Sequence, residues 1–436
     1  MAESKPEAEE HTAPTPGQQE LQPGAWRNVW LLGGTSFFTD FSSDMTYSLR
    51  GILVTAVLGG PAWAVGLIEG VAESLASILK LFSGALSDWL GRRKEPTIFG
   101  YSSSVVGKFL VYLAGVITSW PFVFLGQVVD RFGKGVRTAP RDALIGDGIR
   151  QEYRGRAFGI QRTLDHAGAL AGAIACYLIL KFVFGRLPDP DQHIYKVFLY
   201  AIIPGIIGVV LLFFVKEIRK PEKAKAPTEP WAGEAKRPSL YWRWMSLDRR
   251  LRVFLVIVFL FSLANFSNQF MLLKLKLDLG YSTPVVVLHY ALFNALAALL
   301  AYPAGRISDV LGRKGVVATA YLFYGVVYVG LAVAGPGVWT WVLFAAYGLF
   351  LAMTEGVEKA LVSDLAPAHA RATALGLYAM LVGAGILPAS LIAGALYMVD
   401  PAVPFVVAGV LSVVAGAALW LLLDMSDEGS KGEGEQ

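Results

Sequence analysis

Acidic side chains lie inside two apolar stretches of this chain, where an unpaired charge is costly. Asp40 and Asp44 are four residues apart, so they share one face of a helix. Glu73 lies in the middle of the next apolar stretch, and Glu69 lies near the level of Arg50, with which it is expected to pair. A carboxyl group in a low-dielectric surrounding takes up a proton more readily than it does in water. Asp40, Asp44 and Glu73 are therefore candidates for binding a proton or a cation.

Basic side chains occupy a later apolar stretch with helical spacing. Lys134, Arg137 and Arg141 are three and four residues apart and form one stripe on a helix, with Arg131 about a quarter-turn away. Lys134 and Arg137 are candidates for lining a substrate cavity, where they would act as counter-ions of an anionic solute. The alternative is that these acids and bases neutralise one another and hold the helices in register.

The second half of the chain offers mostly neutral polar groups. Asn265, Asn268 and Gln269 share one face of a predicted helix, where they can orient a ligand or bond across helices. Glu355 lies in a later apolar stretch and is a further candidate for the substrate cavity.

Two loops repeat a pattern of a small residue, an acid, a turn glycine and basic residues. We assign them to a cytoplasmic gate, formed by Gly84, Asp88, Gly91, Arg92, Asp309 and Arg313. A second repeat supports two similar halves, because Arg141 and Glu358 are separated by the same 217 positions as Asp147 and Asp364. The charges of Arg141 and Glu358 are opposite, so the two are predicted to form an ion pair in the same gate.

The elements that position these residues must be membrane-spanning helices. Of the 436 residues, 55% are hydrophobic and only 17% are charged, and the mean hydropathy is +0.51. Soluble domains are about 25% charged. The single cysteine, Cys176, excludes an internal disulfide and a cysteine metal cluster, and no metal site is expected.

A bilayer-spanning helix takes about 20 apolar residues, and the sequence has twelve such stretches in two groups of six. The seventh, at 253–277, is predicted as one helix. The expected fold class is an all-α integral membrane protein with two pseudo-symmetric six-helix bundles and a site between them. The expected division is a disordered cytoplasmic tail at 1–26, a bundle at 27–215, a basic cytoplasmic linker at 216–252, a bundle at 253–423 and a disordered cytoplasmic tail at 424–436.

The orientation follows from the placement of basic residues. They cluster in the loops after the even-numbered stretches, as in Arg92-Arg93-Lys94 and Arg313-Lys314, and in the linker. The positive-inside rule makes these loops, and with them both termini, cytoplasmic. We expect a multi-pass protein of the plasma membrane, which is the inner membrane if the source is a Gram-negative bacterium.

The first loop carries the residues of a known family signature. Gly84, Asp88, Gly91, Arg92 and Arg93 match the pattern G-x-x-x-D-x-x-G-R-R/K of the major facilitator superfamily, and Trp89 stands where that family usually has a basic residue. The sequence resembles this family of secondary transporters over 27–423. The resemblance implies the major facilitator fold, with a central cavity lined by the first span.

Two further motifs extend the resemblance. The segment 131–135 is similar to the family's fourth-helix motif, whose arginine is associated with proton coupling, and this implies such a role for Arg131. Gly159, Gly168 and Gly172 match part of the fifth-helix pattern of the drug-antiporter-like exporters, although Ala173 replaces the proline of that pattern. Several such exporters use an acid in the first span to bind protons or a cationic substrate, which implies this role for Asp40 and Asp44.

We therefore expect a secondary active transporter that works by alternating access and exports an amphiphilic or cationic compound in exchange for protons. One alternative is proton-coupled uptake of a small organic anion. Another is export of a hard divalent metal cation through Asp40, Asp44 and Glu73, since carboxylates suit such ions. The sequence lacks common hydrolase and P-loop patterns, so we expect no enzyme. The expected energy source is the proton gradient without a cofactor, and the expected partners are a small solute and the lipid bilayer, with no nucleic acid and a monomeric chain.

Overall fold

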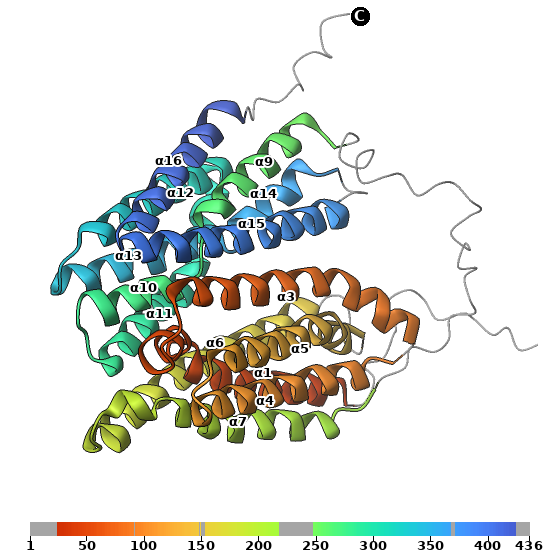
Figure 1. Ribbon diagram of the computed structural model, residues 1–436. Helices are drawn as coiled ribbons and strands as arrows, with labels where there is room; N and C mark the ends of the chain where they lie inside the picture. Colours follow the sequence, from red (N-terminus) through yellow and green to blue (C-terminus); the bar gives the residue numbers. More distant parts are fainter. Residues whose placement is uncertain are drawn as a thin grey trace, which may run out of the picture.

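The computed structural model describes residues 24–90, 92–147, 149, 153–217, 247–367 and 371–423, and for 81, 84–90, 147 and 372 it describes the backbone alone. The described residues form helices and their connections, with no strand among them (Figure 1). The predicted tails and most of the predicted linker lie outside this description. The helices begin slightly inside the predicted tail and linker, since the first starts at Ala25 and the seventh span at Arg249.

The first half of the chain forms six spans, two of which continue through short π-helical turns. The elements are α1 (Ala25–Tyr47), α2 (Arg50–Ile52) with the π-helical turn Leu53–Val57, α3 (Ala62–Leu90), α4 (Lys94–Val116), α5 (Trp120–Asp147), α6 (Arg154–Leu178) with the π-helical turn Ile179–Val183, and α7 (Tyr195–Phe213).

The second half forms six more spans, and its first and fourth spans are interrupted. The elements are α9 (Arg249–Ala264), α10 (Gln269–Leu273) with the π-helical turn Lys274–Asp278, α11 (Thr283–Leu311), α12 (Arg313–Val333), α13 (Val338–Thr354), α14 (Val357–Leu365), α15 (Arg371–Val399) and α16 (Val403–Leu422).

Ten of the described spans are long and apolar enough to cross a membrane. The two that do not meet this criterion are the first span, which contains α1, and α5. Both are long enough, at 23 and 28 residues, but they carry many of the polar and charged side chains discussed above. With them, the described part of the chain has the predicted twelve membrane-spanning helices. Helices α1 and α5 supply six of the eight charged side chains of the candidate site described below.

The spans pack as two groups of six. In the first half α1 lies on α6 and α7, and α5 lies between α3 and α4; in the second half α12 lies on α16, α11 on α13, and α9 on α15 and α16. The groups meet where α3 lies along α15, where α6 meets α11 and where α2 meets α10 (Figure 1). All three contacts join the two halves, so a cavity between the halves is lined by residues of each half.

Small residues set the spacing of the helices. Gly168 and Gly172 of α6 lie directly against the backbone carbonyls of Phe37 and Phe41 in α1, and a Cβ atom at either glycine would collide with them. Close backbone approach through glycine is the usual way in which membrane helices gain packing contacts. Gly159, in contrast, has open space around it. Two of the three glycines of the fifth-helix pattern therefore hold α6 on α1.

The two ends of the molecule differ in how the halves are joined. We call the end with the α3–α4 and α11–α12 connections the linker end, and the other the distal end. At the distal end the halves are tied by Gln269, which donates to the Tyr47 carbonyl at 2.8 Å and accepts from the Gly51 N–H at 3.0 Å. Asp191 adds an ion pair to Lys276 at 2.6 Å and accepts a hydrogen bond from Thr283.

Toward the linker end, one ion pair crosses between the halves in the described part of the chain. Arg162 of α6 and Glu355, just after α13, lie 2.6 Å apart. Their side chains are 57% and 51% exposed, so solvent reaches past them. The described contacts therefore close the distal end, whereas the one described ion pair between the halves toward the linker end is exposed to solvent.

Candidate functional site

A polar cavity of about 240 Å³ lies between the two halves at mid-molecule. Residues of α1, α2, α3 and α5 form one side, and residues of α11 with the α9–α10 connection form the other. The cavity is lined by Asp40, Ser43, Asp44, Tyr47, Arg50, Glu73, Asp130, Arg131, Lys134, Arg137, Asn268, Tyr290, Phe293 and Asn294. It brings together seven of the residues predicted for coupling or substrate binding, namely Asp40, Asp44, Glu73, Arg131, Lys134, Arg137 and Asn268.

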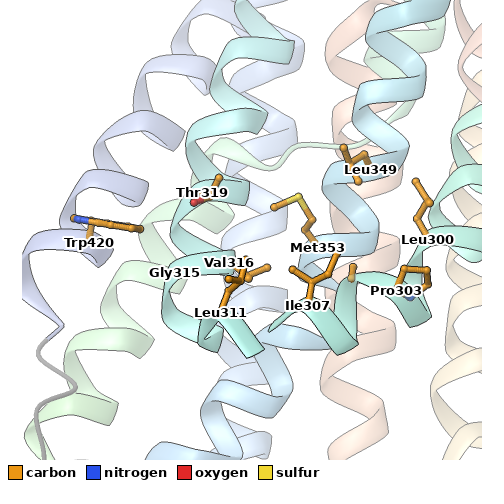
Figure 2. Close-up of a pocket in the computed structure, with 11 residues that line it drawn as sticks. Leu300, Pro303, Ile307, Leu311, Gly315, Val316, Thr319, Leu349, Met353 and Trp420 are labelled. Atoms are coloured by element: carbon orange, nitrogen blue, oxygen red, sulfur yellow. The ribbon is translucent and has the colours of Figure 1, made fainter. Parts of the chain in front are cut away.

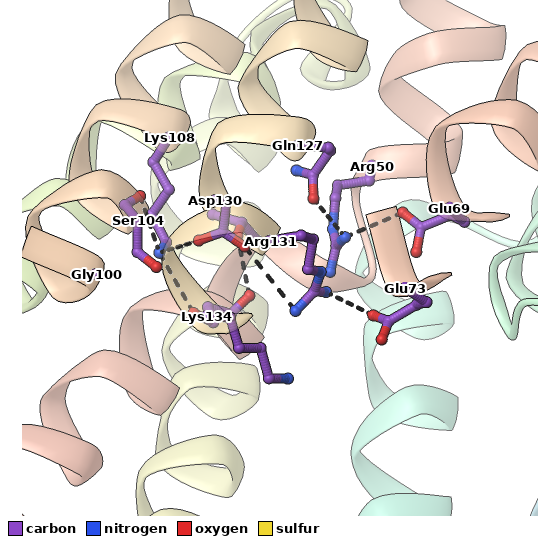
Figure 3. Close-up of polar contacts among 12 residues, drawn as sticks. Arg50, Glu69, Glu73, Gly100, Ser104, Lys108, Gln127, Asp130, Arg131 and Lys134 are labelled. Carbon is purple, nitrogen blue, oxygen red and sulfur yellow. Dashed lines mark hydrogen bonds and ion pairs between the residues drawn. The ribbon is translucent and has the colours of Figure 1, made fainter. Parts of the chain in front are cut away.

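Four ion pairs, which we call the ion-paired network, lie on the first-half side of this cavity (Figure 3). Arg50 and Glu69 pair at 3.0 Å with both side chains buried, as predicted, and Arg50 also donates to Gln127 at 2.7 Å. Arg131 pairs with Glu73 at 3.1 Å. A buried charge is tolerated when it is paired and hydrogen-bonded. Both arginines are ion-paired, but the Nε atom of each has no hydrogen-bond partner among the described residues.

Asp130 joins the network from the same helix as Arg131. Its carboxylate lies 3.9 Å from Arg131 and 3.9 Å from Lys108 of α4. Arg50, Lys108 and Arg131 therefore face the same number of acids, Glu69, Glu73 and Asp130. This set is neutral, which agrees with the structural alternative for these residues.

Arg137 is held by neutral groups instead. It donates to the Ser104 hydroxyl at 2.6 Å and to the Gly100 carbonyl at 3.3 Å, and its guanidinium lies 4.1 Å from the centre of the Tyr101 ring. A cation over an aromatic face is stabilised by the ring quadrupole. Arg137 is thus fixed in place by α4, on the wall of the cavity.

Asp44 makes a contact across the two halves. Its carboxylate accepts a hydrogen bond from the Tyr290 hydroxyl of α11. The Tyr290 ring stacks on Tyr47 with centroids 5.0 Å apart, and the Arg50 guanidinium lies 4.3 Å from the Tyr47 ring centre. Sequence reasoning missed Tyr290, because an aromatic residue in an apolar helix looks like ordinary packing.

Asp40 and Lys134 have no hydrogen-bond or ion-pair partner for their side-chain charges within the described residues, although both line the cavity. In Figure 3 the Lys134 ammonium points away from the ion-paired groups. The cavity therefore presents one acid and one base that the protein itself leaves unpaired.

Three predicted cavity residues lie elsewhere. The prediction of one helix over 253–277 is wrong, because the backbone leaves helical geometry at Asn265, with φ −92° and ψ 71°. The break separates Asn265 and Gln269 from the face of Asn268, whose side chain accepts from the Tyr347 hydroxyl at 2.6 Å. Gln269 belongs to the distal seal, and Glu355 belongs to the ion pair with Arg162.

The predicted gate pair between Arg141 and Glu358 does not form in this structure. Arg141 pairs with its neighbour Asp142 at 2.8 Å, and Glu358 accepts from the Tyr378 hydroxyl at 2.5 Å. The physical reason is the interruption between α13 and α14, which directs Glu358 toward α15 rather than toward the first half. The ion pair that does cross the halves on this side uses Glu355, one turn earlier.

The two gate loops are described to different extents. In the second, Arg313 pairs with Asp309 at 3.1 Å and with Asp364 of α14 at 2.5 Å, so it ties the ends of α11, α12 and α14 together. Gly312 between the helices has φ +88°, a conformation that favours glycine. In the first, Arg92 pairs with Glu95 at 2.9 Å. Gly91, and the surroundings of Gly84 and Asp88, lie outside the described part.

Two other features are separate from this site. A larger cavity of about 360 Å³ lies among α11, α12, α13 and α16 and is lined by apolar groups such as Ile307, Met353 and Trp420 (Figure 2). His289 is a buried packing residue, with hydrogen bonds to the Val285 carbonyl at 2.9 Å and Thr340 at 3.1 Å. The described residues contain no group of three or more His, Cys, Asp or Glu side chains placed to hold a metal ion.

Comparison with known proteins gives consistent matches over nearly the whole chain. A family profile described as Major Facilitator Superfamily matches residues 32–386 and 254–436. An "Uncharacterized MFS-type transporter" of Methanocaldococcus jannaschii is 34% identical over 398 residues, which cover 90% of this chain and 94% of the relative. The "Multidrug resistance protein MdtH" of Cronobacter sakazakii is 24% identical over 391 residues, covering 86% of this chain and 89% of the relative.

A solved structure shares the fold. The nucleoside transporter NupG superposes with a TM-score of 0.74 and 14% sequence identity, over 92% of this chain and 100% of that one. At this identity the likeness concerns the arrangement of helices alone.

Proposed function

Because the chain belongs to the Major Facilitator Superfamily and is a multi-pass membrane transporter, we propose that it exports a small charged solute in exchange for protons. The observation that carries the proposal is the hydrogen bond between Asp44 and Tyr290, which joins the two halves inside a charged central cavity. We further propose that the protein lies in the plasma membrane with its linker end in the cytoplasm. The basic loops at that end support this orientation.

The cavity favours a small and polar solute over a bulky amphiphile. Eight charged side chains line it, Asp40, Asp44, Arg50, Glu73, Asp130, Arg131, Lys134 and Arg137. Its volume of about 240 Å³ lies below the range of about 300–1,000 Å³ that is typical of drug-sized ligand sites. We therefore propose that the solute carries a cationic group and is small and polar, rather than large and amphiphilic.

Asp44 supplies a physical link between charge and conformation. When it is ionised, its bond to the Tyr290 hydroxyl is charge-assisted, and such bonds are about twice as strong as neutral ones. A proton on Asp44, or a cationic group of the solute beside it, removes this extra strength of the hydrogen bond to Tyr290. In either case the contact between α1 and α11 weakens, and the distal seal opens more readily.

This link gives the exchange its order. The empty carrier with an ionised Asp44 stays closed at the distal end, because the Tyr290 contact is then strongest. The carrier moves when Asp44 is neutralised by a proton or paired with the solute. A carrier that changes conformation when it holds a proton or the solute, but not when it is empty, exchanges protons for the solute. The name of the Cronobacter relative, a multidrug resistance protein, supports outward movement of the solute.

Proton-coupled uptake of a small anion is the second candidate. The unpaired Lys134 ammonium and the neighbouring Arg137 favour it, since both face the cavity. Export of a divalent metal is less well supported, because the described residues bring no three acidic or histidine side chains into a metal-binding group.

The test uses the purified full-length chain in liposomes that carry a pH gradient and a pH-sensitive dye. We expect addition of the right solute, from a panel of small cations, anions and zwitterions, to dissipate the gradient in the sense of exchange. Asp44→Asn is expected to lower the solute-driven proton flux at least tenfold. Asp189→Asn is the matched control, because Asp189 is exposed and does not line the cavity, and asparagine tolerates its φ of +47°.

Three outcomes would count against the proposal. Proton movement in the same direction as the solute would replace exchange with symport. Full flux in Asp44→Asn would remove Asp44 from coupling. Absence of solute-driven proton movement across the whole panel would remove proton coupling itself.

A further inference from the structure

We propose that the transported solute is a small zwitterion, bound with its cationic group at Asp40 and Asp44 and its anionic group at Lys134. This inference rests on the proposed function, since it names the class of solute that the same cavity takes. It is drawn from the pairing of the charges in the cavity wall.

Most charges in and around the cavity are already satisfied by the protein. Glu69, Glu73 and Asp130 neutralise Arg50, Arg131 and Lys108 within the ion-paired network. Arg137 is held by Ser104, a backbone carbonyl and the Tyr101 ring. These charges are therefore paired or held by the protein itself, although Arg50 Nε, Arg131 Nε and one Asp130 oxygen have no hydrogen bond among the described residues.

What remains is one unpaired charge of each sign. Asp40 on α1 and Lys134 on α5 line the same cavity, and no ion pair joins them or satisfies either one among the described residues. Asp44, one turn beyond Asp40 on the same face of α1, has only the neutral Tyr290 hydroxyl as a partner. The acids lie on one helix and the base on another, so the complementary ligand carries two separated charges.

A solute with a single charge fits this wall poorly. When it enters, it displaces water from both Asp40 and Lys134 but pairs with only one of them. The other is left desolvated and unpaired, which is strongly unfavourable in a low-dielectric surrounding. A zwitterion pairs with both Asp40 and Lys134 and adds no net charge to the cavity. The cost of removing water from the two side chains is then offset by two ion pairs.

The second half offers neutral groups that suit the middle of such a solute. The Asn268 side-chain carbonyl accepts from Tyr347 at 2.6 Å, which leaves its NH₂ group as a donor. The Asn294 NH₂ group donates to the Tyr290 carbonyl at 2.9 Å, which leaves its side-chain carbonyl as an acceptor. Both line the cavity. A zwitterion on Asp40 and Lys134 therefore touches the second half through one donor and one acceptor, and it bridges the halves that must move.

The experiment compares matched probes on the purified full-length protein. The first set of probes is the zwitterion 4-aminobutanoate with its single-charge analogues butylammonium and butanoate. Two further sets use glycine and 6-aminohexanoate, each with its matched amine and carboxylate, so that the distance between the two charges varies. Binding is measured as the shift in melting temperature over a concentration series. We expect at least one zwitterion to bind at least tenfold more tightly than both of its single-charge analogues.

Variants then test the two contacts separately. Lys134→Gln is expected to weaken the zwitterion at least tenfold and to leave the matched amine unchanged, whereas Asp40→Asn weakens both the zwitterion and the amine. Lys181→Gln and Asp189→Asn are the controls, because both residues are exposed and lie outside the cavity. A purely structural role for Lys134 and Asp40 would lower the melting temperature of the unliganded protein without changing this selectivity.

The inference is overturned if no zwitterion binds, or if an amine or an acid binds as tightly as its matched zwitterion. This result is distinguishable from failure of the proposed function. A zwitterion that binds with the expected variant pattern but moves no protons in the liposome assay would overturn the exchange mechanism and leave the class of ligand intact. A single-charge solute that drives proton exchange would do the reverse.

Discussion

At the scale of single residues, the contact between Asp44 and Tyr290 distinguishes this cavity from a merely polar one. It is formed by a hydroxyl of α11 and a carboxylate of α1, so it exists only while the two halves are together at this level. Tyr290 is also stacked on Tyr47, which fixes the ring and directs the hydroxyl. A contact of this kind senses the charge on Asp44 and the position of the halves at the same time.

Removing the Tyr290 hydroxyl is expected to loosen coupling rather than to abolish transport. Hydrogen bonds to charged groups contribute about 1.5–3 kcal/mol, and about 1.4 kcal/mol corresponds to a factor of ten. Tyr290→Phe should therefore raise downhill solute flux without a pH gradient about tenfold, because the empty carrier is no longer held closed. The measurement is solute efflux from liposomes at equal pH on both sides.

Tyr302→Phe is the control for this prediction, since Tyr302 lies on the same helix and is 74% exposed. An equal rise in both variants, or no rise in Tyr290→Phe, would mean that the hydroxyl does not hold the empty carrier.

The sequence predicted the first-half residues of the cavity well and those of the second half poorly. Asp40, Asp44 and Lys134 stand out because a charge in an apolar stretch is costly and therefore conspicuous. Tyr290 and Phe293 carry no such signal, since aromatic residues are common in packed membrane helices. The predicted pair of Arg141 and Glu358 is absent from this structure, since equivalent positions in a repeat do not have to face each other.

At the scale of helices, the seam between α3 and α15 governs how closely the halves approach. Ser74 of α3 donates to the Gly383 carbonyl of α15 at 2.6 Å. Nearer the distal end, Gly66 of α3 lies directly against the Ser390 carbonyl, where a Cβ atom would collide with backbone. Backbone cannot move aside as a flexible side chain does, so the seam closes only with glycine at this position.

Gly66→Ala is therefore expected to destabilise the distally closed structure by about 1–3 kcal/mol, the usual cost of overpacking. The measurement is chemical unfolding together with the transport rate in liposomes. Gly159→Ala is the matched control, because Gly159 is also helical but has no neighbouring atom within 4 Å of an added Cβ. If both variants unfold and transport alike, close approach at Gly66 is not a condition for closure.

At the scale of helices, the sequence predicted the spans but not the breaks inside them. Hydrophobic length predicted all twelve spans, because a bilayer imposes nearly the same length on each. It did not predict the breaks after α9 and α13, since the residues there, Asn265 and Gly356, are also tolerated inside membrane helices. Those breaks decide that Gln269 seals the distal end and that Glu355, rather than Glu358, meets the first half.

At the scale of the whole molecule, the two similar halves contribute unequally. Every charged side chain of the cavity wall belongs to the first half, and the second half supplies Asn268, Tyr290, Phe293 and Asn294. In the proposed mechanism the first half thus binds the proton and the charges of the solute. The second half moves against it and senses the occupant through hydroxyl and amide groups.

The central claim is that the cavity is reached from the linker end at rest and from the distal end only during exchange. The single cysteine, Cys176, is buried, so Cys176→Ala provides a background for one new cysteine, Ser43→Cys, in the cavity wall. A membrane-impermeant maleimide is applied to one side of oriented liposomes at a time. We predict labelling from the linker side at rest, and labelling from the distal side only when solute and a pH gradient are both present. Equal labelling from both sides at rest, or none from the distal side during transport, would contradict this claim.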